Sequence, residues 1–255
     1  EKRPLDQLDS LDSFHVQIEA MKVGLFLADR YVADPKQMKL RPADLLDGDL
    51  LREYARKIDK SASATPPIDR LKGGDTVYLS ACDSSGVMVS FIQSNYFGFG
   101  SGIVVPGTGI ALQNRGWGFT LERGHPNEVG PGKKPFHTII PGFLTKGSRP
   151  FGSFGVMGGP MQAQGHLQMT NRIVNYHQNP QAASDAPRWQ ILSDFSVAVE
   201  PGFPSSIAEG LAERGHKVKY MTSYHSFGGA QIILSNDNGY VAGSDHRKEG
   251  AAVGF

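Results

Sequence analysis

Thr76 follows Gly73, Gly74 and Asp75 and opens a segment of alternating apolar and polar residues. A threonine inside a chain is a weak nucleophile because no base holds its hydroxyl ready. A threonine that begins a chain carries its own α-amine, whose pKa of about 7.7–8.0 suits it to act as that base. Breaking the Asp75–Thr76 bond would create such a residue, and the two glycines would let the backbone bend for attack by the hydroxyl. On its own, however, such a threonine is more often an ordinary strand residue.

A pair of glycines, Gly158 and Gly159, stands just before a segment of helical spacing that begins at Pro160. Proline suits the first turn of a helix, where no backbone N–H is needed. Two glycines ahead of it would point free amides outward, and such amides can hold the negative oxygen that forms when a nucleophile attacks a carbonyl. The pair predicts an oxyanion-binding turn, with a plain tight turn as the alternative.

Two helices are predicted before Thr76. The first covers residues 10–32 and ends before Pro35, because apolar side chains recur there at three- and four-residue spacing. The second covers about 44–58. Residues 59–75 lose this periodicity, and their Ser, Ala, Pro and Gly content predicts an exposed, flexible connector that a self-cleaving reaction could reach. The apolar faces of the two helices comprise Phe14, Ile18, Met21, Leu25 and Ala28, and Leu46, Leu50, Tyr54 and Ile58.

Strands dominate after Thr76. The segments 76–83 and 87–96 alternate across the turn DSSG and predict a hairpin. Helices are predicted from Pro160 onward and over about 205–214. Two helices, a run of strands, a helix and more strands favour an α+β fold. The other predicted strands lie near 103–105 and 109–114, in a hairpin of 137–144 with 151–157, near 217–222 and 230–235, and in a last hairpin around SNDNG.

Composition excludes several classes of partner. The 255 residues carry a formal charge of +1, from 26 basic and 25 acidic side chains, which gives no field for nucleic acid or an anionic membrane. No segment has the length of a membrane span. The single cysteine, Cys82, and the spacing of the eight histidines predict no metal site and no organic cofactor. The first residues lack an initiator methionine and a signal-type apolar region, which predicts a fragment or a processed end.

From about residue 15 to the end, the chain resembles the gamma-glutamyltransferase family of N-terminal-nucleophile hydrolases. The matching stretches are EAMKVGLFLADRYVADP (19–35), GGDTVYLSACDSSGVMVS (73–90), GFGSGIVVPGTGIALQN (98–114), NEVGPGKKP (127–135), GVMGGPMQ (155–162), DAPRW (185–189) and GSDHR (243–247). The resemblance implies an αββα four-layer sandwich, of which this chain supplies only part. It also implies a precursor that cuts itself, with 1–75 ending the large subunit and 76–255 forming the small catalytic subunit.

The resemblance also implies catalytic roles. The threonine that opens the segment matched by TVYLS is the family's nucleophile, so this role is expected for Thr76, with the cleavage site between Asp75 and Thr76. Gly158 and Gly159 match the Gly-Gly pair whose amides form the family's oxyanion hole. Ser94 stands where the family has a threonine that hydrogen-bonds the nucleophile.

Three further residues match family positions that contact the substrate. Asn95 lies one place before the ungapped position of a family asparagine, where this chain has Tyr96, so Asn95 is the expected contact to substrate or nucleophile. His137 and Thr138 align with paired serines that receive the substrate carboxylate. Both can donate a hydrogen bond, although a lone histidine in such a segment is slightly more often structural.

The chain departs from the family in the loop QNRGWGF. Where the family has a glutamine and an aspartate that bind the glutamyl group, this sequence has Arg115 and Gly118. An aspartate there would pair with the substrate ammonium, so its loss together with a gained arginine shifts recognition from a cation to an anion. This change resembles cephalosporin-acylase-like members, which hydrolyse amides of dicarboxylic acids. The alternative is a solvated loop position for Arg115.

Three functions remain open on this basis. The first is a self-processing amidohydrolase or acyltransferase that cleaves gamma-glutamyl amides of the glutathione type. The second keeps the chemistry but acts on dicarboxyl-monoamides. The third is an unprocessed, non-catalytic family member. The family's substrate-gripping arginine lies upstream of this chain, so an upstream large-subunit polypeptide is the expected partner beside the small amide substrate, and the compartment is left open between cytoplasm and periplasm.

Overall fold

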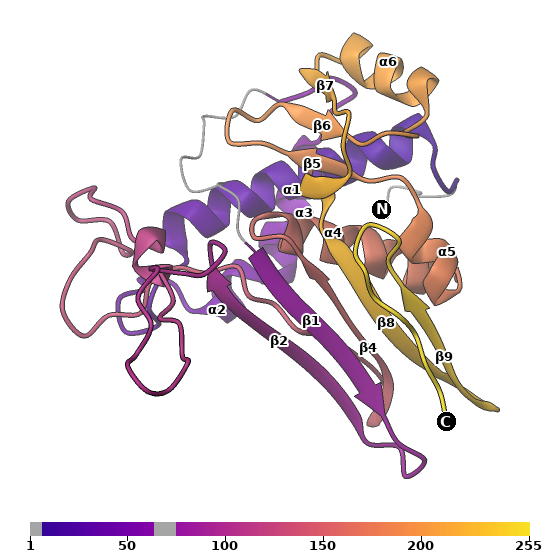
Figure 1. The fold of residues 1–255 in the computed structure, drawn as a ribbon. Helices are drawn as coiled ribbons and strands as arrows, with labels where there is room; N and C mark the ends of the chain where they lie inside the picture. The colour runs from indigo at the N-terminus through magenta and orange to yellow at the C-terminus, as the bar shows by residue number, and fades with distance from the viewer. Residues whose placement is uncertain (1–6, 64–74) are drawn as a thin grey trace.

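Helix α1 (Leu11–Tyr31) begins after Ser10, whose side chain caps its first turn. The computed structural model describes residues 7–63 and 75–255 of the chain. The helix confirms the prediction over 10–32, and it buries Phe14, Ile18 and Leu25 on one face. Figure 1 shows α1 running beneath the small sheet and helix at the upper end of the molecule.

The single helix predicted over 44–58 is wrong, because the chain forms two. Helix α2 (Pro42–Leu45) ends before Leu46, its C-cap, and α3 (Gly48–Lys57) begins after Asp47. The Asp47 side chain accepts hydrogen bonds from the amides of the first turn of α3. An aspartate that caps a helix in this way ends the preceding one, because it takes the place of a backbone acceptor.

Two antiparallel sheets pack face to face. A Cβ on Gly155 of the larger sheet would lie only 2.4 Å from the Tyr78 ring of the smaller one, so glycine is required where the two sheets meet at this point. The predicted hairpins 76–83/87–96 and SNDNG are both confirmed. The smaller sheet contains β1 (Asp75–Cys82) and β2 (Met88–Tyr96), and the larger one, in spatial order, β3 (Gly142–Lys146), β4 (Arg149–Met157), β8 (Gly229–Asn236) and β9 (Gly239–Ser244).

Helices α4 (Met161–Thr170) and α5 (Pro180–Asp185) cover the other face of the larger sheet, as Figure 1 shows. A Cβ on Gly165 of α4 would lie 2.5 Å from the Val156 side chain, whereas the neighbouring Gly155 faces β1. The layers therefore run helix, sheet, sheet, which confirms the expected α+β class. A π-helical turn, Asn171–Asn175, extends α4. The short helix α5 was not predicted from the sequence.

A third, small sheet forms a separate layer with α1 and α6 (Ser205–Glu213). Its strands are β5 (Trp189–Ile191), β6 (Val197–Val199) and β7 (Val218–Tyr220), of which only β7 was predicted. Burying each large apolar side chain contributes about 1.5–3 kcal/mol to the stability of the folded state. The shared core consists of Phe14, Ile18, Leu25, Trp189, Ile191, Phe195, Val197, Val199, Phe203, Ala208 and Leu211.

Two predicted strand regions are wrong. Residues 103–105 and 109–114 form a loop with one isolated bridge, Val104 to Ala111, instead of two strands. Pro106 cannot donate to a ladder, and Gly107 and Gly109 adopt positive φ angles that turn the chain. The hairpin strand predicted from residue 137 begins only at the start of β3, because Pro141 interrupts the run before it. Short 3₁₀ helices occupy Arg115–Gly118 and His225–Phe227.

The stretch that leaves α3 is tied to α1 by buried polar groups. His15 Nε2 lies 2.7 Å from the Asp59 carbonyl oxygen, and the Ser63 amide donates to Glu19 at 3.0 Å. His15 Nδ1 lies 2.8 Å from His216 Nε2, and burial lowers the pKa of His216 to about 4. The predicted connector 59–75 therefore starts with anchored residues, and residues 64–74, Gly73 and Gly74 among them, lie outside the described part.

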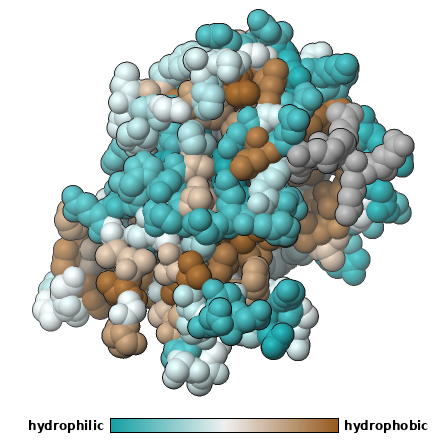
Figure 2. Space-filling view, turned by 90° about the vertical axis from the view of Figure 1, so that its right-hand side faces the viewer, coloured by the Kyte–Doolittle hydropathy of each residue, from teal (hydrophilic) through white to brown (hydrophobic). Residues whose placement is uncertain are grey.

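The surface of the described chain is mixed in character. Figure 2 shows one face on which hydrophilic side chains predominate and apolar side chains gather in separate patches toward its lower part. Among residues 7–63 and 75–255, no helix has the length and apolar character needed to cross a membrane. Nor do these residues bring together three or more metal-ligating side chains.

Candidate active site

Thr76 lies at a β-bulge in the ladder of β1 and β2. Strand β2 carries one extra residue at this point, so that Ser94 and Asn95 together stand opposite Thr76. Tyr96 follows with a φ angle of +83°, in the left-handed region that a residue with a side chain rarely adopts. Bulges and such strained residues are frequent beside active sites, because they redirect side chains. The regular pairing of β1 and β2 is therefore interrupted at Thr76, the predicted nucleophile.

The carbonyl before Thr76 is held by a hydroxyl group. Ser94 Oγ donates to the Asp75 carbonyl oxygen at 2.6 Å, and it accepts a hydrogen bond from the Tyr96 amide at 2.9 Å. The Asp75 carboxylate accepts from the Gly98 amide at 3.1 Å. A donor on a carbonyl oxygen draws electron density from its carbon and favours attack there. Ser94 therefore contacts the bond that was predicted to break, from the carbonyl side.

Gln162 connects Thr76 to the first turn of α4. Its Nε2 donates to Thr76 Oγ1 at 3.2 Å, its Oε1 accepts from the Ile140 amide at 2.9 Å, and its own amide donates to the Gly159 carbonyl at 3.0 Å. This fully buried residue was not predicted as part of the site. A glutamine in a helix carries no local signal, since its partners lie 22 and 86 positions away.

Gly158 and Gly159 form the turn that was predicted before α4. Their φ angles are +118° and +59°, so both adopt conformations that favour glycine. Within the described residues, neither amide donates to a protein acceptor. A Cβ on Gly158 would lie 3.0 Å from Gly228 Cα, and the preceding carbonyl, that of Phe227, accepts from Arg188 Nη1 at 2.9 Å. The turn is therefore packed from behind and has amides available for a ligand oxygen.

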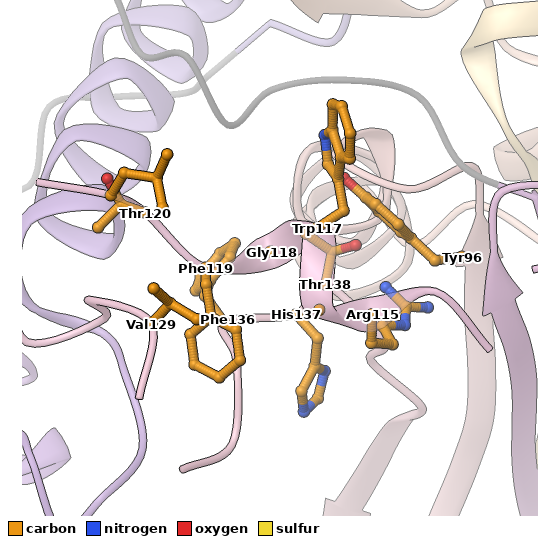
Figure 3. A pocket seen from close by; sticks show the side chains of 12 residues that line it. Tyr96, Arg115, Trp117, Gly118, Phe119, Thr120, Val129, Phe136, His137 and Thr138 are labelled. Carbon is orange, nitrogen blue, oxygen red and sulfur yellow. The ribbon is translucent and has the colours of Figure 1, made fainter. Parts of the chain in front are cut away.

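A cavity of about 370 Å³ begins at the end of the bulge. In Figure 3, Tyr96 and Arg115 face one another on one side, with Phe119, Val129 and Phe136 on the other. The cavity thus combines one cationic wall with one apolar wall. The lining residues are Tyr96, Arg115, Gly116, Trp117, Gly118, Phe119, Thr120, Leu121, Val129, Phe136, His137 and Thr138.

Arg115 is buried rather than solvated. It is 8% exposed, its guanidinium carbon lies 4.7 Å from the centre of the Tyr96 ring, and burial lowers its pKa. An arginine nevertheless remains charged at neutral pH. Within the described residues, its Nε has no hydrogen-bond partner and no carboxylate pairs with the guanidinium. A buried cation without a counter-ion is costly, so the site is suited to an anionic ligand.

His137 and Thr138 lie on the wall next to Arg115. Thr138 Oγ1 is buried and has no hydrogen-bond partner within the described residues. Burial, with the positive charges of Arg115 and Lys134 nearby, lowers the pKa of His137. The Ile139 amide donates to His137 Nδ1 at 3.2 Å, so the neutral ring carries its proton on Nε2 and can donate from there.

Asn127 holds the two walls of the cavity together. It is fully buried, its Nδ2 donates to the Gly118 carbonyl at 2.6 Å, and its Oδ1 accepts from the Phe136 amide at 2.9 Å. These bonds cross a loop without regular structure, where the sequence gives no periodic pattern to interpret. The Asn127 side chain therefore connects the backbone next to Arg115 with the backbone next to His137.

The predicted residues fall into two linked groups. Thr76 and Ser94 meet at the bulge, and Gln162 connects Thr76 to the glycine turn. Arg115, His137 and Thr138 line the cavity, which Tyr96 joins to the bulge. Asn95 stands opposite Thr76, but among the described residues its side chain has only a long contact of 3.5 Å, from Gln93 Nε2.

Comparison with known proteins places these features in a family. The family model for gamma-glutamyltranspeptidase matches residues 3–255. The Bacillus subtilis glutathione hydrolase-like YwrD proenzyme is 35% identical over 96% of this chain and 48% of its own length. The oxamate amidohydrolase proenzyme of Klebsiella pneumoniae is 35% identical over 97% of this chain and 48% of its length. The chain spans about half the length of these curated relatives.

A solved structure gives the same result for the fold. The crystal structure of a cephalosporin acylase from Bacillus halodurans superimposes with a TM-score of 0.89 and 45% identity, over 98% of this chain and 46% of that one. One of these three proteins is a cephalosporin acylase, and the loop at Arg115 predicted a resemblance to cephalosporin-acylase-like members. With a family match over nearly its whole length, the chain belongs to the gamma-glutamyltranspeptidase family.

Proposed function

We propose that the protein is a self-processing amidohydrolase in which Thr76 is first the agent of chain cleavage and then the nucleophile toward substrate. The observation that carries the proposal is the arrangement at the bulge. Thr76 Oγ1 accepts from Gln162, and the carbonyl of the preceding residue accepts from Ser94 at 2.6 Å. The nucleophile and a polarised carbonyl are thus neighbours in the chain. The names of the relatives, which are proenzymes, support the same interpretation.

Self-cleavage would proceed by an acyl shift. Thr76 Oγ attacks the Asp75 carbonyl carbon, the carbon–nitrogen bond breaks, and the hydroxyl proton is transferred to the nitrogen that becomes the α-amine. The Asp75 acyl group is then an ester on Thr76 Oγ. Water hydrolyses this ester, leaving a carboxylate on Asp75 and a free hydroxyl beside a free amine on Thr76. The Ser94 hydroxyl stabilises the negative oxygen that forms at the Asp75 carbonyl during attack.

Turnover would use the same hydroxyl. The α-amine takes the proton from Thr76 Oγ as this oxygen attacks the substrate amide, and the amine product leaves with that proton. The amides of Gly158 and Gly159 would hold the substrate oxyanion, since such donors act where negative charge develops. Water or a second amine then removes the acyl group from Thr76.

The decisive experiment is intact-mass analysis with N-terminal sequencing of the protein in its full natural length. The expected result is a fragment that begins TVYLS. Recovery of only the uncut chain from freshly purified and from incubated samples would contradict the proposal. It would favour the alternative of an unprocessed, non-catalytic family member.

For the substrate, we propose an amide that carries a free carboxylate and lacks a nearby ammonium. Arg115, Thr138 and His137 offer a cation and two donors on one wall, and the residues that line the described cavity include no aspartate or glutamate to pair with an ammonium. A dicarboxyl-monoamide fits this wall better than a gamma-glutamyl amide does. The gamma-glutamyl amide remains the second candidate, favoured by the glutathione hydrolase-like relative.

Replacing Arg115 by methionine tests this preference. We expect kcat/KM for glutaryl-p-nitroanilide to fall by roughly 10- to 100-fold, because a hydrogen-bonded charge contributes about 1.5–3 kcal/mol. With γ-glutamyl-p-nitroanilide, Arg115→Asp should raise the relative rate, because the new carboxylate can pair with the ammonium. Arg123→Met, in an exposed part of the same loop, is the matched control. An unchanged ratio between the two substrates in both Arg115 variants would refute the assignment.

Replacing Ser94 by alanine should slow self-cleavage by about 10- to 100-fold, because the donor on the Asp75 carbonyl is lost. Ser94→Thr retains the hydroxyl and should cleave at nearly the wild-type rate. The measurement is the fraction of cut chain against time on denaturing gels. Ser90→Ala is the control, since Ser90 lies on the same strand and donates instead to the Gly142 carbonyl. Equal rates in the Ser94→Ala and Ser90→Ala proteins would exclude the role.

We also propose that an upstream polypeptide packs on the outer face of β1 and β2, as the large-subunit assignment requires. Val77 and Leu79 of β1 and Val89 and Phe91 of β2 are 44–62% exposed on that face. Leu79 pairs directly with Phe91, so these side chains form one continuous apolar surface. Residues 1–75 would then end the large subunit, and residues 76–255 would form the small one.

A further inference from the structure

Helix α4 carries three glutamines whose side chains are almost fully buried, Gln162, Gln164 and Gln168. Two of them have the same pattern of bonds. Gln164 donates to the Ile191 carbonyl at 3.1 Å and accepts from the Ile191 amide at 2.7 Å. Gln168 donates to the Trp189 carbonyl at 3.0 Å and accepts from the amide of the same residue at 3.3 Å. Both therefore bind the backbone of β5 and hold the helix against that strand.

Gln162 differs from its two neighbours in what its donor contacts. Its oxygen accepts from a backbone amide, as in the other two glutamines, and here the donor is Ile140. Its Nε2, however, donates to the hydroxyl of Thr76 instead of to a backbone carbonyl. The Ile140 N–H can only donate, so the end of the Gln162 side chain that faces it must be the oxygen. The end that faces Thr76 is consequently the NH₂ group, and Thr76 Oγ1 must accept.

We propose that Gln162 sets the orientation of the Thr76 hydroxyl and stabilises the negative charge that develops on its oxygen. This inference rests on the proposed function and adds a catalytic residue that the sequence patterns did not identify. A hydroxyl has one hydrogen and two lone pairs. A fixed donor on one lone pair directs the hydrogen elsewhere, toward the nitrogen that receives it, and leaves the second lone pair for attack.

The same bond serves in both proposed reactions. In self-cleavage the oxygen loses its proton as it attacks the Asp75 carbonyl, and in turnover it does so as it attacks the substrate. In each case an N–H donor strengthens its bond as the oxygen becomes negative. Gln162 also donates its backbone amide to the Gly159 carbonyl, so the glycine turn and the nucleophile are positioned by one residue.

The test is the rate of self-cleavage of the full-length protein, produced by cell-free translation with a labelled amino acid so that uncut chain is seen from the start. Gln162→Met keeps the volume of the side chain and removes both polar ends. Gln164→Met is the matched control, because it makes the same change in the same helix, at equal burial. We expect Gln162→Met to cleave about 10- to 100-fold more slowly than Gln164→Met. Thermal unfolding of both variants establishes that each is folded.

A second variant separates orientation from mere support. Gln162→Glu keeps an acceptor for Ile140, but the ionised carboxylate cannot donate to Thr76, whereas the protonated acid can. The cleavage rate of Gln162→Glu relative to wild type should therefore fall as the pH rises through the pKa of the new carboxyl, ordinarily about 4.3 and raised by burial. A purely structural role predicts a constant ratio.

The outcomes distinguish a failure of the Gln162 role from a failure of self-cleavage itself. If wild type and Gln164→Met are cut and Gln162→Met is cut at the same rate as Gln164→Met, the role of Gln162 is refuted and the proposed function stands. A ratio for Gln162→Glu that does not change with pH refutes it likewise. If wild type itself stays whole, the proposed function fails, and the role of Gln162 fails with it.

Discussion

Thr76→Ala is expected to leave the full-length protein as one chain and to abolish amide hydrolysis. Alanine has no oxygen to attack the Asp75 carbonyl, and without cleavage no α-amine is released to act as base. Loss of a nucleophile removes at least about 10³-fold in rate. Intact mass and release of p-nitroaniline from glutaryl- and γ-glutamyl-p-nitroanilide measure the two effects separately.

Thr76→Ser and Thr145→Ala serve as controls for this variant. Serine keeps the hydroxyl and should be cut, at a reduced rate, because it lacks the methyl group that restricts the side-chain rotamer. Thr145 is exposed on β3, and its replacement should change neither cleavage nor turnover. A Thr76→Ala protein that still yields a chain beginning at residue 76 would show that another group, or a protease, cuts the bond.

Asp245→Asn is expected to lower the free energy of unfolding by about 3–5 kcal/mol, because it removes one charge from a buried ionic network. Asp245 is 1% exposed and bonds Arg188 at 2.6 Å and Arg247 at 3.1 Å. Glu200 pairs with Arg247 on its other side. Without the aspartate, Glu200 would be left to balance two buried guanidinium groups. Urea unfolding of wild type and variant measures the difference.

Glu53→Gln is the control for Asp245→Asn, since Glu53 forms an exposed pair with Lys57 on α3. Such pairs contribute about 1 kcal/mol or less. A loss of stability in Asp245→Asn no larger than in Glu53→Gln would contradict the importance of the network.

The stability that Asp245 provides should also depend on pH. Burial alone would raise the pKa of Asp245, but Arg188 and Arg247 hold it below the ordinary value. A carboxyl with a lowered pKa in the folded state stabilises the protein above its unfolded pKa of about 3.9 and loses this effect as the pH falls further. The difference between wild type and Asp245→Asn should therefore be full at neutral pH and shrink only below about pH 4.

The sequence predicted those elements whose pattern is local. Helix α1 has a long periodic face, and β1 and β2 alternate over eight and nine residues, so both were identified. Strands β5 and β6 have three residues each, all buried, and a run that short has no measurable period. The strands predicted at 103–105 and 109–114 were wrong. The apolar residues there are typical of strands, but Pro106 and the glycines determine the backbone conformation.

In the site, too, only residues with a local sequence pattern could be predicted. Thr76 and the glycine pair stand out because a nucleophile and an oxyanion turn have recognisable neighbours in the chain. Gln162 and Asn127 act through partners that only the folded chain brings to them, Ile140 and Thr76 for the first, Gly118 and Phe136 for the second. The departure at Arg115 was visible in the sequence, but its burial and its lack of a counter-ion among residues 7–63 and 75–255 were not.

Helix α1 lies before the proposed cut, yet its Phe14, Ile18 and Leu25 belong to the same core as Trp189 and Leu211, which lie after it. Cleavage would therefore divide the covalent chain without dividing the folded unit. The nicked protein would hold together as long as it stays folded, but once unfolded its two pieces would diffuse apart. Refolding would then require two separate chains to meet. Folding as a single chain would be possible only before the cut, and self-cleavage would make this change irreversible.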